Sequence, residues 1–66
     1  MTWDDPEDIA LALMEKFPGQ DPLEVRFTDL RDRVLAFTGF TGTREECSER
    51  KLEAIQMAWH EEWQDR

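Results

Sequence analysis

The stretch LEAIQMAW, residues 52–59, decides the fold because its large apolar side chains recur at helical spacing. Leu52, Ile55 and Trp59 follow one another at steps of three and four residues, which places them on one face of an α-helix. Trp63 lies one helical turn further along, and the sequence leaves open whether it belongs to the same stripe. The polar residues between them fall on the opposite face. The stretch therefore predicts a helix that buries one side against other helices.

Two residues qualify as the start of this helix. Thr43 followed by Glu46 matches the capping-box pattern, in which each residue satisfies a backbone N–H of the other. Ser48 is also a good N-cap, since its hydroxyl can accept a hydrogen bond from the first turn. Both starts are consistent with the sequence.

A first helix is predicted from Pro6 to Phe17. Pro suits the first helical position, and acidic residues around it complement the positive end of the helix dipole. Ile9, Leu13 and Phe17 form its apolar stripe at four-residue steps, and the Pro-Gly pair at 18–19 ends it. Trp3, just upstream, is expected to fold over this helix.

A second helix is predicted from Asp29 to Phe37, with Thr28 as its cap. Arg31, Asp32 and Arg33 are expected to project outward from it. The alternation of Val25, Arg26 and Phe27 indicates a short extended segment before it. Residues 38–43 carry two glycines and no periodicity, which indicates a loop. With 66 residues there is room for one core only. We expect a single domain spanning residues 1–66, mainly all-α, in which three helices surround one core.

Charge and cysteine content restrict the classes of function. Sixteen acidic residues against eight basic ones give a net charge of −8, which repels both nucleic acid and anionic lipid and favours basic protein surfaces or cations. Cys47 is the one cysteine, so it forms no intramolecular disulfide, and a lone thiol suits a reducing compartment. No apolar segment is long enough to span a bilayer. A cytoplasmic protein is expected.

Catalytic motifs are missing from the sequence. It contains no glycine-rich phosphate loop, no nucleophile with an adjacent base and no pair of histidines that could ligate a metal. His60, the one histidine, has no visible partner to orient it and is expected on the surface. We therefore expect a binding protein and not an enzyme.

Motifs distributed over nearly the whole chain resemble the IscX family of iron-sulphur cluster assembly accessory proteins. The most specific is VRFTDL at residues 25–30, and its spacing to LEAIQMAW at 52–59 also fits the family. The other matching positions are Trp3, Asp5, Ile9, Leu13, Pro18, Asp21, Pro22, Phe40, Glu61 and Glu62. The resemblance implies a modified winged-helix fold, binding to the cysteine desulfurase that supplies sulphur, modulation of that enzyme, and weak binding of iron through surface carboxylates.

Two groups of acidic residues are candidate sites. Hard oxygen ligands crowd the start of the first helix, where they could share a ferrous ion weakly or simply cap the helix; these residues are Asp4, Asp5, Glu7 and Asp8. A second acidic surface could dock on an Arg or Lys patch of the desulfurase or merely be a solvated face; its residues are Asp8, Glu15, Asp21, Glu24 and Asp29.

The predicted function is an accessory regulator that docks on the cysteine desulfurase and binds ferrous iron weakly, with no required cofactor. Other iron-sulphur assembly proteins are further candidate partners. The alternatives are an iron donor or adaptor, and a generic acidic module with another basic partner. Where some family members carry aspartates, this chain has Thr41, Gly42 and Thr43. This difference removes potential iron ligands from that loop.

Overall fold

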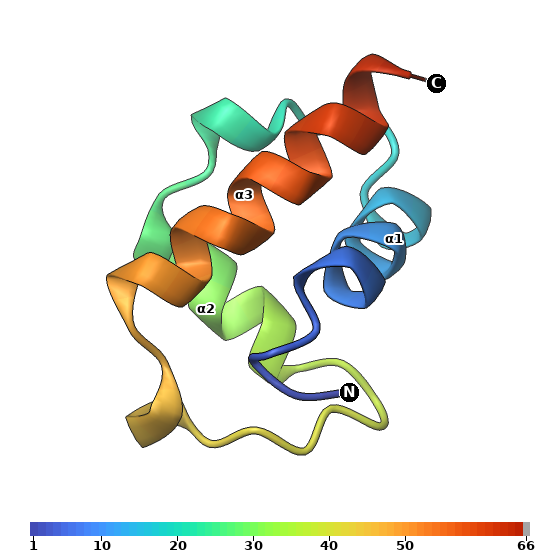
Figure 1. Ribbon diagram of the computed structural model, residues 1–66. Helices are drawn as coiled ribbons and strands as arrows, with labels where there is room; N and C mark the ends of the chain where they lie inside the picture. The colour runs from blue at the N-terminus through green and yellow to red at the C-terminus, as the bar shows by residue number, and fades with distance from the viewer. Residues whose placement is uncertain (66) are drawn as a thin grey trace.

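Three α-helices and two short 3₁₀-helices make up the computed structural model, which describes residues 1–65 (Figure 1). In chain order they are α1 (Pro6–Lys16), η1 (Pro22–Glu24), α2 (Phe27–Leu35), η2 (Arg44–Glu46) and α3 (Glu49–Gln64). No strand occurs among the described residues, which confirms the all-α prediction. The winged-helix relationship stays a prediction.

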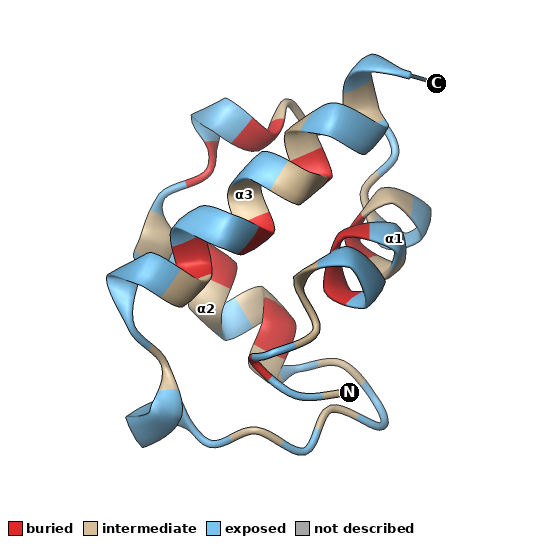
Figure 2. Ribbon diagram, viewed as in Figure 1, coloured by how far each residue is buried: buried red, intermediate tan, exposed pale blue. Residues whose placement is uncertain are grey.

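Helix α3 is the centre of the fold. Helix α1 packs along it, and η1 and α2 also contact it (Figure 1). The stripe predicted from LEAIQMAW is confirmed, because Leu52 is 5% exposed and both Ile55 and Trp59 are fully buried. Figure 2 shows the buried residues on the sides of the helices that face one another. The other buried apolar residues are Trp3, Ile9, Ala10, Leu13, Val25, Leu30 and Val34.

The boundaries of α1 differ slightly from the prediction. The helix ends at Lys16, and Phe17 is its C-cap with φ −129°, although the Phe17 N–H still donates to the Leu13 carbonyl at 2.7 Å. Asp5 occupies the N-cap position, but its side chain accepts no hydrogen bond from the helix. It accepts one from the upstream Thr2 N–H, at 2.9 Å. The carboxylate therefore fixes the N-terminal segment and not the first turn of α1.

Helix α2 begins two residues earlier than predicted. The Leu30 N–H donates to the Arg26 carbonyl at 2.8 Å, so Arg26 is the N-cap and Thr28 lies within the first turn. Of the three residues predicted to be extended, Val25 and Arg26 are, whereas Phe27 is the first residue of α2. The residues before them are wound into η1, where the Asp21 side chain accepts a hydrogen bond from the backbone of the turn. Helix α2 also ends before Phe37.

Both predicted starts of the last helix are used, each by a different element. The Glu46 carboxylate accepts a hydrogen bond from the Thr43 N–H at 2.8 Å and closes η2. The Ser48 hydroxyl accepts one from the Lys51 N–H at 3.3 Å and caps α3. The two cap signals therefore reflect two consecutive helical turns.

Trp3 ties the N-terminus to the loop that follows α2. Its side chain is 3% exposed, and its indole N–H donates to the Thr43 carbonyl at 2.6 Å. The Phe40 ring meets it edge-on, with ring centroids 4.8 Å apart. Nearby, the Thr41 N–H donates to the Met1 carbonyl at 2.8 Å. The N-terminal segment is thus held by the loop as well as by α1.

Candidate functional site

The outward face of α1 carries one exposed apolar side chain among carboxylates. Asp8, Leu11 and Glu15 lie at positions i, i+3 and i+7, so they share one side of the helix, opposite the buried Ile9 and Leu13. All three are exposed, and Leu11 is 53% exposed. We call Asp8, Leu11 and Glu15 the α1 face. It combines negative charge with an apolar contact point.

Leu11 did not emerge from the sequence as a site residue. It stands within the apolar run from Ile9 to Met14, but it was assigned neither to the predicted apolar stripe nor to a candidate site. Its position in the sequence could have revealed this. Leu11 is two residues after Ile9, which places it on the opposite side of the helix from the buried stripe.

The other predicted docking residues lie elsewhere. Asp21 is half-buried, and its Oδ1 accepts a hydrogen bond from the Leu23 N–H at 3.0 Å, so it has a local structural role. Glu24 in η1 and Asp29 in the first turn of α2 are exposed. Figure 1 shows η1 on the opposite side of α3 from α1. The predicted acidic residues therefore do not form one continuous surface. Asp8 and Glu15 of the α1 face form one group, and Glu24 on η1 belongs to another, across α3 (Figure 1).

The predicted metal ligands surround a hollow of about 290 Å³ at the start of α1, lined by Asp4, Asp5, Pro6, Glu7 and Asp8. Two of these carboxylates already have partners. Asp4 Oδ1 lies 3.1 Å from Lys51 Nζ, and Asp5 accepts the hydrogen bond from Thr2. Within residues 1–65, no three His, Cys, Asp or Glu side chains are arranged to hold a metal ion.

Cys47 lies in a second hollow, of about 260 Å³, where the start of α3 meets α2. Arg31 and Arg44 also line it. Burial raises the pKa of the Cys47 thiol, and the positive charges of Arg31 and Lys51 oppose that shift only in part. At neutral pH the thiol is accordingly protonated, which is the less nucleophilic form.

The His60 ring stacks on Trp63, with centroids 6.1 Å apart and ring planes inclined by 27°. His60 is half-buried by this contact. Among the described residues, no helix has both the length and the apolar character needed to cross a membrane.

Comparison with known proteins identifies the family. An uncharacterized protein of Pseudomonas aeruginosa is 42% identical over 62 residues, which cover 94% of each chain. The sequence model of the family described as iron-sulphur cluster assembly matches residues 1–64. The chain therefore belongs to the iron-sulphur cluster assembly family, and the resemblance to IscX is confirmed.

Proposed function

We propose that this chain is an accessory regulator of iron-sulphur cluster assembly that binds the cysteine desulfurase through the α1 face and binds ferrous iron weakly. Membership of the family supports a role in the pathway. The desulfurase and the iron are our inference from the acidic surface and from the resemblance to IscX.

The single observation that carries the proposal is the composition of the α1 face. The carboxylates of Asp8 and Glu15 have no ion pair with other described residues, so they are free to meet Arg or Lys side chains. Opposite charge accelerates encounter and aligns the partners. Burial of the exposed Leu11 side chain adds apolar stabilisation, at ~25 cal/mol per Å² removed from water. Occupation of the desulfurase surface by this face would tune sulphur delivery without any chemistry on this chain.

Iron binding is proposed as a weak second activity. Because Asp4 and Asp5 are engaged by Lys51 and Thr2, Glu7 and Asp8 are the carboxylates available at the start of α1. Two carboxylates without a preformed cage leave most coordination positions to water. Ferrous ion also stands low in the affinity order of divalent metals. The geometry supports regulation with weak iron binding more than it supports iron storage.

The test is a calorimetric titration of the cognate desulfurase with the double variant Asp8→Lys/Glu15→Lys. Reversal of both charges places cations against a basic surface, and we expect affinity to fall by about tenfold or more. The matched control is Glu45→Lys/Glu53→Lys, which changes the net charge equally at exposed positions outside the α1 face. The control should bind more tightly than the α1 variant.

Four further results define the outcome. Affinity of the unmodified chain should weaken as salt increases, because ions screen exposed charges. Leu11→Ala should weaken binding without changing that salt dependence. Equal affinities for the two charge-reversed variants would remove the α1 face from the interface. Saturable ferrous binding together with no desulfurase complex would support the iron-donor alternative instead.

A further inference from the structure

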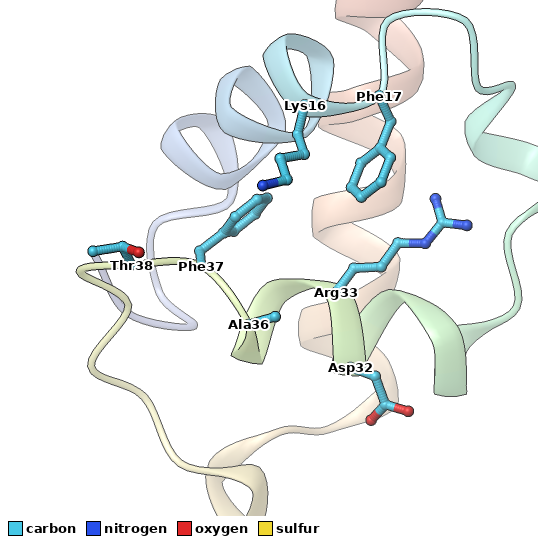
Figure 3. Close-up of a pocket in the computed structure, with 7 residues that line it drawn as sticks. All are labelled: Lys16, Phe17, Asp32, Arg33, Ala36, Phe37 and Thr38. Atoms are coloured by element: carbon cyan, nitrogen blue, oxygen red, sulfur yellow. The ribbon is translucent and has the colours of Figure 1, made fainter.

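A hollow of about 360 Å³ lies between the C-terminal ends of α1 and α2, outside the acidic face (Figure 3). This volume falls in the range of about 300–1,000 Å³ that is typical of ligand pockets. Two aromatic rings and two cations characterise its lining, in a chain whose net charge is −8. The lining residues are Lys16, Phe17, Asp32, Arg33, Ala36, Phe37 and Thr38.

Arg33 was expected to project outward, and the structure corrects this. Its guanidinium carbon lies 4.5 Å from the centroid of the Phe17 ring, and the side chain is half-buried by this cation–π contact. One of its terminal nitrogens is buried and has no hydrogen-bond partner within residues 1–65. A buried donor without an acceptor is costly. The contact with the Phe17 ring offsets part of that cost, and an incoming acceptor would meet the other nitrogens of the guanidinium.

The positive charge at the hollow is not neutralised by its own residues. Asp32 is the one carboxylate in the lining, but it is paired with Arg31, whose Nε lies 3.3 Å from Asp32 Oδ1. Figure 3 shows the Asp32 carboxylate pointing away from the two rings. Lys16 has no carboxylate within ion-pair distance among the described residues.

A purely structural role explains these cations incompletely. Both Lys16 and Arg33 lie in the last turn of a helix, where positive charge complements the helix dipole. Dipole complementation accounts for the sign of the charge. It does not account for the donor without an acceptor or for the open hollow between the two Phe rings.

We propose that this hollow binds an acidic segment of a partner protein, with one carboxylate at Lys16, a second carboxylate at Arg33 and an apolar side chain between Phe17 and Phe37 (Figure 3). A free small anion is the weaker candidate, because it has no apolar group to bury against the two Phe rings. A peptide brings both interactions together. None of Asp8, Leu11 and Glu15 lines the hollow, so this inference is independent of the proposed desulfurase contact.

The test is a ¹H–¹⁵N NMR titration of the full chain with the peptide acetyl-Glu-Leu-Phe-Glu-amide. We expect saturable shifts at the amides of Lys16, Phe17, Arg33 and Phe37. The neutral analogue acetyl-Gln-Leu-Phe-Gln-amide and the apolar-deficient analogue acetyl-Glu-Ala-Ala-Glu-amide should each bind more weakly. Absence of shifts at these amides at millimolar peptide would overturn the proposal.

Variants locate the interaction on the two cations. Arg33→Gln should weaken peptide binding by about tenfold, because it removes a hydrogen bond between two charged groups. Arg26→Gln is the matched control, because Arg26 is exposed at the opposite end of α2, and it should bind within about twofold of the unmodified chain. Lys16→Gln should also weaken peptide binding. Because Lys16 is exposed, we do not expect this substitution to unfold the chain.

Two controls distinguish other occupants. Inorganic phosphate that produced the same saturable shifts would indicate a general anion site and refute the peptide assignment. Shifts at the same amides that depend on protein concentration without peptide would indicate a second copy of the chain, and would refute it as well.

Discussion

The most direct test of the fold is a substitution at Gly42, because the structure leaves no room for a side chain there. A Cβ added at Gly42 would lie 2.7 Å from Trp3 Cδ1 and 2.8 and 2.9 Å from two atoms of the Phe40 ring. Overpacking of this kind costs ~1–3 kcal/mol, because rings fixed on several sides must move. Gly42→Ala should therefore release the contact that holds the N-terminal segment against the loop.

Gly19→Ala is the matched control. Nothing lies within 4 Å of a Cβ at Gly19, and its φ is not positive. Both substitutions remove the same freedom from the unfolded chain, which by itself stabilises by ~0.4–1 kcal/mol. The difference in unfolding free energy between the two variants therefore isolates the clash. It should be ~1–3 kcal/mol in favour of Gly19→Ala.

Urea unfolding followed by circular dichroism measures this difference directly. Thermal unfolding should show it as well, since ~1 kcal/mol corresponds to ~4–8 °C in a domain of this size. Replacing Phe40 by Leu in the Gly42→Ala background should recover part of the loss, because Phe40 supplies two of the three close contacts. Equal stability of Gly42→Ala and Gly19→Ala would refute the close packing of this loop on Trp3.

The core and the thiol give three more predictions. Ile55→Ala should lower the unfolding free energy by ~2–5 kcal/mol, because Ile55 is fully buried, whereas Leu11→Ala at an exposed position should change it little. Native Cys47 should react with iodoacetamide more slowly than the urea-unfolded chain at the same pH, because burial raises its pKa, and Arg31→Gln should slow it further. The same raised pKa means that the folded state favours the neutral thiol, so stability should fall as pH rises through the thiol range, and Cys47→Ala should lack this fall.

Regular helical spacing made the core predictable. The stripes of α1 and α3 were readable because only one face of each helix is buried, and the structure buries Ile9, Leu13, Ile55 and Trp59 completely. The start of α2 was less readable. There a 3₁₀ turn at Pro22–Glu24 takes up residues that otherwise look extended, and a turn stabilised by one side chain leaves no periodicity in the sequence.

The positions of the candidate site residues were predictable only as far as they depend on one helix. The exposure of Asp8 and Glu15 was predictable because both fall off the apolar stripe of α1. Arg33 was predicted to project outward because the residue spacing within α2 gives no information about contacts with other helices. The structure shows that its guanidinium packs on the ring of Phe17, at the end of α1. Contacts between elements far apart in sequence need the tertiary arrangement, and this applies equally to Trp3 and the loop near Thr43.

The division of charge in the structure restricts how this protein can meet its partners. Asp8 and Glu15 lie on α1, whereas Glu24 lies on η1 across α3, so one flat basic surface cannot contact both groups at once (Figure 1). Leu11 is exposed beside the first group and Leu23, 56% exposed, beside the second. Each group thus offers an apolar contact with adjacent negative charge. A partner that buries one group leaves the other, and the cationic hollow at Arg33, accessible to a second protein.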